Sequence, residues 1–388
     1  MSSESGVTRE QLREIFEKSI RPELDALRSS QRASEPTLVL VGAQPGAGKT
    51  RTVGRAQKDF RGAIPVIGDD LRVFHPDYVS VMREDPLRMP EVTAQAAGAW
   101  ARMSSDYLRE RQASVVFETT FRQPDAVVAT AKEFRDAGYR VEVRALAVPE
   151  AVSRLGVLSR YAEQVRDQGA GRWTPQAFHD VAAEQMPKSL ERVIAEGHVD
   201  RVLVVDRGGR TLYAADIDTN AASTAGTRDG ADARAAVIAG RDLDSLTPSD
   251  ANTWLAALDR DANFVLRQAD LGSDVLATID DLRTDATHIA ARAHTTQSPA
   301  HAEIWAALAA LGARTSAARE ALGHSELPPQ SGAVEQRAKS PRLTTGLTTE
   351  LATALDHTTS PLADPNRSHA STRARTQQAS PQHERHER

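Results

Sequence analysis

Residues 37–50 read TLVLVGAQPGAGKT. The first five are apolar residues that favour β-structure, which is typical of a buried strand. A buried strand that runs into a glycine-rich turn and then opens a helix is the P-loop arrangement. Such a turn directs backbone N–H groups at a phosphate, and the following helix adds the positive end of its dipole. The stretch therefore predicts a nucleoside triphosphate site.

Two residues at the end of this turn have specific predicted roles. Lys49 is expected to reach the β- and γ-phosphates, and the Thr50 hydroxyl is expected to bind Mg²⁺. Ala43 stands where glycine is commonest, and alanine fits there if its φ is negative. The predicted nucleotide-binding residues are Gln44, Pro45, Gly46, Ala47, Gly48, Lys49 and Thr50.

Composition narrows the class of protein. The chain has 388 residues, a formal net charge of −5 and no cysteine. The negative balance gives no electrostatic reason to expect nucleic acid as a partner, and the missing cysteines exclude disulfides and cysteine-ligated zinc. No apolar run is long enough for a membrane span, and the N-terminus does not resemble a signal peptide. We therefore expect a cytoplasmic protein that binds neither nucleic acid nor membranes.

Strand-like and helix-like segments alternate over the first half of the chain. Further buried strands are predicted at 64–67, 114–117, 141–148 and 201–206, and helices at 8–29, 91–111, 124–137, 149–168 and 175–196. Pro22 is expected to kink or divide the first helix. This alternation predicts an α/β fold with a doubly wound, mainly parallel sheet.

The character of the chain changes after about residue 217. We expect a kinase-like domain over 1–217, a linker over 218–249 that has little to bury, and a helical region over 250–322. Residues 323–388 are poor in large apolar groups and rich in Ser, Thr, Pro, Arg and His, which predicts a disordered tail.

Acidic residues follow two of the predicted strands. In an open α/β sheet the ligand lies beyond the carboxyl ends of the strands, so these residues are expected to meet the P-loop. Asp69 or Asp70 is placed to accept a proton from an attacking hydroxyl, although either could simply cap the next helix. Glu118 ends a strand, as acids that hold Mg²⁺ through water do, and it could instead bind substrate hydroxyls or be an ordinary surface carboxylate.

Polar and cationic residues further along are weaker candidates. Thr120 and Arg122 lie in the loop after Glu118 and could hydrogen-bond a polar substrate. Arg160 and Arg172 could neutralise a transferring phosphoryl group, since glycines around Arg172 suit a mobile lid. Solvated surface arginines are an equally good interpretation of these two residues.

Several separate motifs in this order resemble the zeta toxin family, the kinase half of bacterial toxin–antitoxin modules. The resemblance runs from about Val7 to Tyr213. Its motifs are the P-loop; Asp69-Asp70-Leu71-Arg72-Val73-Phe74-His75-Pro76; Glu118-Thr119-Thr120-Phe121-Arg122; Ala147-Val148-Pro149; Arg160-Tyr161; and Arg172-Trp173-Thr174-Pro175.

The resemblance implies a kinase that uses ATP or GTP, with Mg²⁺, to phosphorylate the 3′-hydroxyl of the sugar in UDP-N-acetylglucosamine. Such a reaction blocks cell-wall precursor synthesis and poisons the cell. It also implies a role for each matching residue. Asp69 takes the place of the catalytic base, Lys49 of the phosphate-binding lysine, and Thr50 of the Mg²⁺ ligand. Arg160 and Arg172 fall on the transition-state arginines, and Arg72, Glu118, Thr120 and Arg122 on the substrate-binding positions.

Departures from the family pattern concern the acceptor. Phe121 is bulky where glycines surround the threonine in the family, so it is expected to alter the fit to the sugar. Trp100-Ala101-Arg102 lies near the position expected for an acidic substrate contact. A kinase for another hydroxyl acceptor, such as a nucleotide, an antibiotic or NAD, is the nearest alternative. A nucleotide-gated interaction protein without phosphoryl transfer is an alternative from another class.

Partners follow from the same resemblance. It implies a small helical antitoxin protein that covers the nucleotide site, besides the UDP-sugar substrate. The helical region 250–322 could serve that purpose in cis, or it could be additional packing for the kinase domain.

Overall fold

The structure is a computed structural model that describes residues 6–28, 35–218, 223–268, 271–293 and 299–325. Its sheet has six strands in the order β2-β3-β1-β4-β5-β6. The first five are parallel and β6 is antiparallel to β5. The strands are β1 (Thr37–Gly42), β2 (Ile64–Ile67), β3 (Val115–Thr119), β4 (Arg140–Leu146), β5 (Arg201–Val205) and β6 (Thr211–Asp216). The predicted doubly wound, mainly parallel sheet is confirmed.

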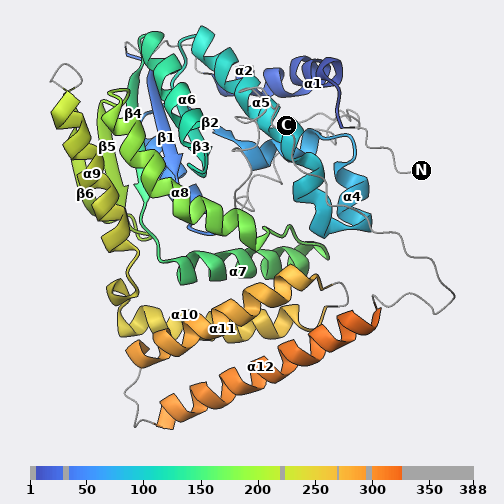
Figure 1. Ribbon diagram of the computed structural model, residues 1–388. Coiled ribbons are helices and arrows are strands. Elements are labelled where there is room, and N and C mark those ends of the chain that lie inside the picture. The colour runs from blue at the N-terminus through green and yellow to red at the C-terminus, as the bar shows by residue number, and fades with distance from the viewer. Residues whose placement is uncertain (1–5, 29–34, 219–222, 269–270, 294–298, 326–388) are drawn as a thin grey trace, which may run out of the picture.

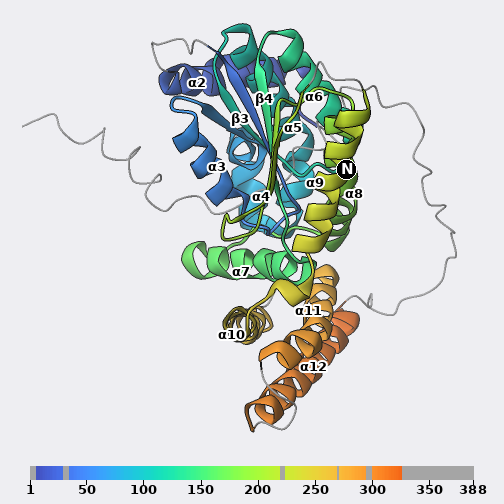
Figure 2. The same cartoon turned by 90° about the vertical axis from the view of Figure 1, so that its left-hand side faces the viewer.

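Helices cover both faces of this sheet (Figure 2). One face carries α3 (Lys49–Asp59), and the other carries α5 (Met89–Glu110), α6 (Pro124–Asp136), α8 (Gln176–Ala195) and α9 (Ser223–Gly240). Side chains of β1 alternate between the two layers, because successive residues of a strand point to opposite faces. Leu38 and Leu40 enter the core under α5, α6 and α8, whereas Val39 and Val41 enter the core under α3.

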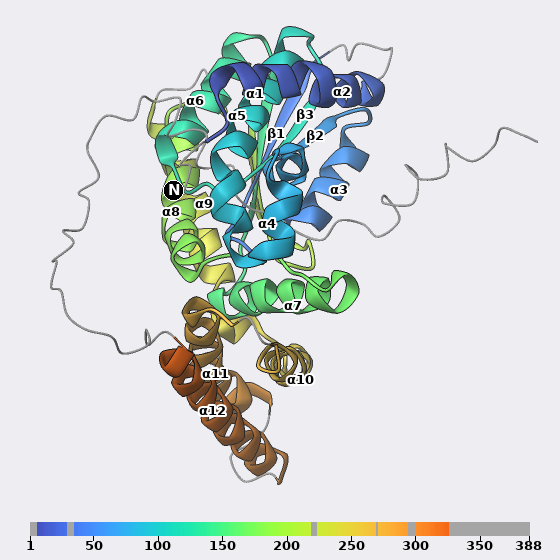
Figure 3. The same cartoon turned by 90° about the vertical axis from the view of Figure 1, so that its right-hand side faces the viewer.

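The N-terminal helix is divided before Pro22, as predicted. It comprises α1 (Arg9–Ile15), a π-helical turn η1 (Phe16–Ile20) and α2 (Arg21–Leu27). Proline has no N–H for the carbonyl one turn earlier, which favours such an interruption. These helices lie across α5 (Figure 3), where the Trp100 indole Nε1 donates to the Leu12 carbonyl at 3.0 Å. Trp100 is therefore a packing residue at the amino end of the sheet.

The prediction of a linker with little to bury over 218–249 was wrong, because α9 occupies 223–240. Ala233 and Val237 are fully buried in the core of the domain. Small residues let α9 approach α8 closely: a Cβ on Gly230 would lie 2.6 Å from the Glu191 carbonyl oxygen. A pattern rich in alanine and glycine has few large apolar side chains, yet it suits helices whose backbones pack closely together. A short turn, η4 (Leu243–Ser245), then leads to the C-terminal helices.

Helix α7 (Glu150–Gln168) runs across the carboxyl edge of the sheet, and the C-terminal helices stack beyond it (Figure 1). These are α10 (Pro248–Val265), α11 (Ser273–Ala293) and α12 (Pro299–Ser325). They form a separate core with α7, in which Leu158, Leu258 and Ile279 are buried. The helical region is as predicted, whereas most of the predicted tail, 326–388, lies outside the described residues. None of the helices in the described ranges is long and apolar enough to cross a membrane.

Short elements complete the region between β2 and α5. They are η2 (Gly68–Phe74), α4 (Tyr78–Glu84) and η3 (Pro86–Arg88).

Carboxylates of the C-terminal helices hold α7 and the loop after it. Asp261 of α10 accepts from the Ser159 hydroxyl and from Arg166, each at 2.7 Å. Asp274 of α11 accepts from the Trp173 indole Nε1 at 2.6 Å and from the Gln176 backbone N–H at 3.1 Å. The C-terminal helices are thus bonded to α7, which precedes the 169–175 loop, and to the first residue of α8, which follows it.

We expect Asp274→Ala to lower the free energy of unfolding by about 1–3 kcal/mol, because it leaves the buried Trp173 indole N–H without an acceptor. Asp280→Ala is the matched control on the same helix. Asp280 pairs with Arg319 at 2.6 Å between side chains that are 30% and 52% exposed, so its loss is expected to cost about 0–1 kcal/mol. Urea unfolding of both variants measures the difference. Equal costs would contradict the anchoring role of Asp274.

Candidate active site

The P-loop connects β1 to α3, as its sequence predicted. Gly48 is the residue before α3 and has a φ of +90°, and Gly46 has a φ of +75°, both in the left-handed region that glycine adopts without strain. Gly46 also lies directly against α7: a Cβ there would be 1.9 Å from the Ser153 carbonyl oxygen. Only glycine allows the loop and α7 to come this close.

Lys49 lies inside the loop at the first position of α3. Its side chain is 2% exposed, and Nζ donates to the carbonyls of Ala43 at 2.9 Å and Gln44 at 3.3 Å. Nζ also lies 3.9 Å from Glu118 Oε1. Burial lowers the pKa of Lys49, although the neighbouring Glu118 and Asp69 act in the opposite direction. A phosphate bound in the loop would offer the Lys49 ammonium group an anionic partner in place of these two carbonyls.

Thr50 fits its predicted role as a metal ligand. Its Oγ1 is buried and forms no hydrogen bond with the described residues. A buried hydroxyl without a partner is costly, so an ion or a ligand bound there would relieve that cost. Over the described ranges, no group of three His, Asp or Glu side chains could hold a metal ion by itself. A magnesium ion would therefore rely on Thr50 and on the phosphates of a nucleotide, which is a common way for proteins to bind it.

Asp69 and Asp70 have different surroundings, although they are adjacent in sequence. Asp69 is buried, and its carboxylate accepts from Arg72 Nε at 2.7 Å and lies 3.1 Å from a terminal nitrogen of Arg172. Asp70 is exposed. Both carboxylates belong to the first turn of η2. The structure thus places Asp69, and not Asp70, beside the cationic groups.

The pKa of Asp69 reflects two opposing causes. Burial raises it, but the positive charges of Arg172, Arg72 and Arg160 outweigh burial, so the pKa lies below the ordinary value of 3.8. Asp69 is therefore ionised at neutral pH. The cluster that surrounds it is defined here as the phosphoryl cluster: Lys49, Asp69, Arg72, Glu118, Arg160 and Arg172.

Arg160 and Arg172 belong to this cluster and are not solvated surface arginines. Arg160 projects from α7, is 4% exposed and donates to the Thr174 hydroxyl. Burial, together with the neighbouring charge of Arg172, lowers the pKa of Arg160 to about 9, which still leaves it protonated at neutral pH. Arg172 reaches Asp69 from the loop between α7 and α8, and the side chain of Arg172 is 14% exposed.

Glu118 lies at the end of β3, in register with Val41 at the end of β1. It is 2% exposed, so it is not an ordinary surface carboxylate. Thr120 is also buried, and the Arg122 guanidinium lies 4.8 Å from the centre of the Phe178 ring. Two predicted substrate residues in the loop after β3 thus have different surroundings: Thr120 is buried, and Arg122 stacks on Phe178.

Phe121, which was expected to alter the fit to the sugar, has its side chain in the core of the domain. Its φ of +55° turns the side chain into the core, where it is fully buried. Its ring occupies the space beside Gly42, since a Cβ on Gly42 would lie 2.7 Å from ring atoms. The Phe121 ring therefore packs against the end of β1 that leads into the P-loop, and it lies in the core.

A small cavity of about 100 Å³ opens beside the catalytic carboxylate candidate. Asp69, Arg72 and Arg172 form one wall of it. Trp173, Thr174 and Pro175 of the predicted motif also line it, whereas sequence analysis missed other lining residues, among them Glu91 and Phe178. Glu91 is an acidic residue in the first turn of α5, a position at which it is normally interpreted as a favourable partner of the helix dipole.

The side chain of Gln44 points into the protein and holds the P-loop in place. Its Nε2 donates to the Val148 carbonyl at 2.8 Å and to the Ser153 hydroxyl at 3.2 Å. Its Oε1 accepts from Arg241 at 2.8 Å. Arg241 follows α9 in the segment expected to be a linker, and burial lowers its pKa to about 10. Sequence analysis missed this residue because nothing local links positions 44 and 241.

Ser153 also contacts His179, with 2.8 Å between Oγ and Nε2, and His179 Nδ1 lies 2.9 Å from Asp180. This order of groups superficially matches a nucleophilic triad. Ser153 is fully buried, and its hydroxyl also contacts the Glu150 carbonyl at 3.0 Å. The group is therefore a support for the P-loop and not a second reactive site.

Comparisons with known proteins agree with this geometry. The family model described as "Zeta toxin" matches residues 23–218. A curated relative, toxin zeta of Enterococcus hirae, is 29% identical over 205 residues, which cover 51% of this chain and 71% of the relative. Toxin PezT of Streptococcus pneumoniae serotype 4 is 27% identical over 198 residues, which cover 50% of this chain and 78% of the relative.

Among solved structures, one from the PezAT chromosomal toxin–antitoxin system of Streptococcus pneumoniae shares the fold. It has a TM-score of 0.55 and 22% sequence identity, and the match covers 68% of this chain and 100% of that chain. The family model spans half of the chain and includes the P-loop and every residue of the phosphoryl cluster. The predicted resemblance is thus confirmed: the chain belongs to the zeta toxin family.

Proposed function

We propose that this protein is a kinase that transfers the γ-phosphoryl group of ATP or GTP to the 3′-hydroxyl of the sugar in UDP-N-acetylglucosamine. Family membership and the phosphoryl cluster support this proposal. One observation carries it: the buried carboxylate of Asp69 lines the cavity of about 100 Å³, which we call the acceptor cavity, and lies 3.1 Å from Arg172, in the same cluster as Lys49. A carboxylate at this point is suited to accept the proton of an attacking hydroxyl, a step that a protein which only binds nucleotide does not perform.

The charge balance of the phosphoryl cluster favours a triphosphate. Four cations, Lys49, Arg72, Arg160 and Arg172, face two carboxylates, Asp69 and Glu118. Excess buried positive charge is costly, and an anionic donor would offset it. Transfer of a phosphoryl group depends mainly on positioning and on charge stabilisation, because the transition state spreads negative charge over its oxygens. Lys49, Arg160 and Arg172 are the groups that we assign to that charge.

Asp69 orients the acceptor hydroxyl and takes its proton as the hydroxyl oxygen attacks the γ-phosphorus. Its lowered pKa makes it a weak base in the free protein. Phosphate charge beside Arg172 and Arg160 would offset part of their effect and raise the pKa of Asp69. Mg²⁺, when bound at Thr50 with the donor, would neutralise phosphate oxygens.

Arg72, Glu118, Thr120 and Arg122 are our candidates for acceptor binding. Arg72 is already committed on three sides, to Asp69, to the Pro90 carbonyl at 2.8 Å and to the Thr93 hydroxyl at 2.6 Å. It thus positions Asp69 as well as lining the acceptor cavity. We further propose that the protein acts as a cytoplasmic toxin that blocks cell-wall precursor synthesis and is restrained by a small helical antitoxin.

The acceptor is tested by mass analysis. Incubating the purified chain with Mg²⁺, ATP and UDP-N-acetylglucosamine is expected to yield the sugar nucleotide with one added phosphoryl group. The 3′-deoxy sugar analogue is the matched control and is expected to give no product. A phosphorylated nucleotide, antibiotic or NAD in place of the UDP-sugar would favour the other acceptor. No phosphorylated product from any acceptor would favour an interaction protein.

The base is tested with two neighbouring substitutions. Asp69→Asn is expected to lower kcat by about 10²–10⁴-fold, because the hydroxyl loses its proton acceptor. Asp70→Asn, on the exposed neighbour, is expected to leave kcat unchanged. Expression of each variant should give the same order, with growth arrest lost in Asp69→Asn and retained in Asp70→Asn. Full transfer by purified Asp69→Asn would refute the assignment.

The pH dependence follows from the pKa of Asp69. Since its pKa lies below 3.8 in the free protein, Asp69 is ionised at every pH above about 5 and loses its charge only below its folded pKa. Burial lowers the pKa of His75 below its ordinary value of 6.5, so this residue is mainly neutral at pH 7 and above. We therefore expect kcat/KM for the donor, Mg²⁺–ATP, which reports the ionisations of the free protein, to stay within about threefold between pH 6 and pH 8. A tenfold fall per pH unit below pH 7 would show that another group accepts the proton.

A further inference from the structure

The P-loop glutamine, Gln44, is fully buried, and both ends of its side-chain amide form hydrogen bonds. Its Nε2 donates to the Val148 carbonyl and to the Ser153 hydroxyl, and both of these residues lie within the family-matched stretch. Its Oε1 accepts from Arg241, which follows α9 and lies beyond residues 23–218. A residue from outside the matched stretch thus completes the hydrogen bonding of this side chain.

The position of Gln44 matters to the phosphate site because of its own backbone carbonyl. Lys49 Nζ donates to that carbonyl at 3.3 Å, and the Ala47 N–H donates to it at 3.3 Å. The first bond sets where the ammonium group rests, and the second closes the turn of the P-loop. A side chain that is bonded to three partners therefore also fixes the carbonyl on which the loop and its lysine depend.

Arg241 is well suited to this task because it is charged while its two bonded partners are neutral. Its guanidinium donates to the Ala183 carbonyl of α8 at 2.5 Å and to Gln44 Oε1 at 2.8 Å. Burial lowers the pKa of Arg241 to about 10, with Glu150 acting in the opposite direction, so Arg241 is protonated at neutral pH. A hydrogen bond from a charged donor is roughly twice as strong as one between neutral groups.

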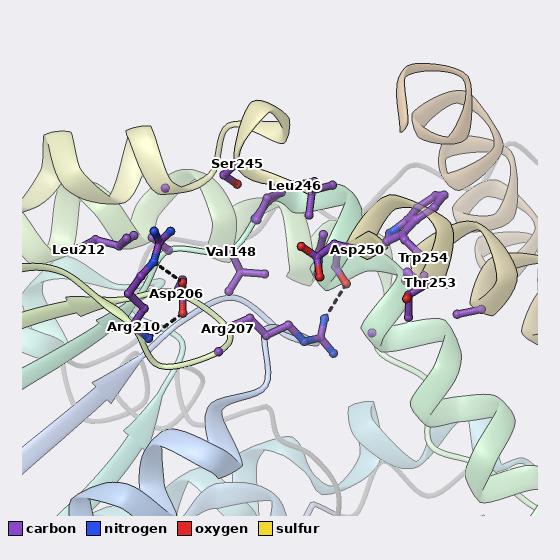
Figure 4. Close-up of a pocket in the computed structure, with 18 of the residues that line it drawn as sticks. Val148, Asp206, Arg207, Arg210, Leu212, Ser245, Leu246, Asp250, Thr253 and Trp254 are labelled. Carbon is purple, nitrogen blue, oxygen red and sulfur yellow. Dashed lines mark hydrogen bonds and ion pairs between the residues drawn. The ribbon is translucent and has the colours of Figure 1, made fainter. Parts of the chain in front are cut away.

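Gly240 brings Arg241 within reach of the P-loop. A Cβ on Gly240 would lie 2.5 Å from Leu212 Cδ1 and 2.7 Å from the Ala147 Cβ, so a larger residue would push the end of α9 away from β6 and from the segment after β4. Figure 4 shows the cavity of about 520 Å³ that Gly240, Leu212 and Val148 all line. The end of α9 and the carbonyl partner of Gln44 thus border the same space.

We propose that Arg241 is a positioning residue for the donor phosphates: through Gln44, it holds the P-loop in the conformation that receives them. This role rests on the proposed kinase function, which supplies the donor. A loop that is already ordered does not spend binding free energy on its own ordering. Loss of Arg241 should therefore weaken the donor through its phosphates and not through its nucleoside.

The consequence concerns the extent of the kinase domain. Residues 23–218, which the family model matches, lack the arginine that bonds the P-loop glutamine. Helix α9 and the residue after it therefore belong to the phosphate site of this chain. They are more than a connection between β6 and the C-terminal helices.

Three variants of the full chain test this role. Arg241→Met removes the guanidinium, whereas Arg241→Lys keeps a charged donor. Arg234→Met is the matched control, because Arg234 also joins α9 to α8, through Glu191 at 2.9 Å, and that bond does not involve the P-loop. Calorimetric titration would use two probes with Mg²⁺: inorganic tripolyphosphate, which has phosphates but no nucleoside, and a non-hydrolysable ATP analogue.

Arg241→Met is expected to weaken both probes by the same factor, about tenfold, because a hydrogen bond from a charged group is lost. Arg241→Lys is expected to restore both affinities to within about threefold of wild type, since its ammonium group can still donate to Gln44. Arg234→Met is expected to stay within about twofold, because it removes only a partly exposed ion pair. Arg241→Gln, whose side chain is shorter, is the second variant should Arg241→Met not fold, and the same loss is expected.

A double substitution tests the route through Gln44. Gln44→Leu removes the acceptor of Arg241 and is expected to weaken tripolyphosphate by itself. Adding Arg241→Met to it is expected to cost no more than about a further twofold, because two residues that act through one contact are not additive. Losses that multiply would overturn the inference, since Arg241 would then act by another route.

Unchanged tripolyphosphate binding by Arg241→Met would overturn the inference and leave the proposed function intact. An equal loss in Arg234→Met would also overturn it, because the loss would then come from the packing of α9 on α8. A loss in Arg241→Lys as large as in Arg241→Met would do the same, since the charged hydrogen bond would not be what matters. Failure of the wild-type chain to bind either probe would overturn the proposed function itself, and this inference with it.

Discussion

The contact between the P-loop and α7 is the constraint on which the rest of the site depends. Gly46 and Gly156 bring two backbones together more closely than any other residues would allow, with clashes of 1.9 Å and 2.3 Å for an added Cβ on either side. Because α7 is fixed there, Arg160 on its inner side reaches the phosphoryl cluster. The loop that follows α7 then carries Arg172 to Asp69. The outer side of α7 forms the core that it shares with the C-terminal helices.

The electrostatics of the cluster explain why it is built from so many interlocked partners. A carboxylate that is buried alone would be neutralised by protonation, because burial disfavours its charged form. Three arginines keep Asp69 ionised, and two of them are themselves oriented by a fixed partner. Arg72 has Pro90 and Thr93, and Arg160 has Thr174. The free-energy cost of burying these charges is offset when the protein folds, so the side chains are already in place before a substrate binds.

Segments that follow residue 218 contact this site from two directions. Asp274 supports the loop that carries Arg172 through the indole N–H of Trp173. Arg241, which lies between α9 and η4, holds Gln44 of the P-loop. Helix α11 is therefore bonded to the loop that carries Arg172, and the segment after α9 is bonded to the P-loop. Residues beyond the family-matched stretch thus contribute to the organisation of the candidate active site.

By itself, the sequence determined the P-loop, the alternating strands and helices, and the division of the first helix at Pro22, because each of these depends on residues close together in the chain. Residue spacing left Asp69 and Asp70 as equal candidates, and only the family resemblance separated them. Tertiary structure decided which of them is buried, that Phe121 turns into the core, and that α9 fills the expected linker. It also joined Trp173 to Asp274, residues 101 positions apart. Such contacts depend on how whole helices pack against one another, and no local pattern of side chains records that.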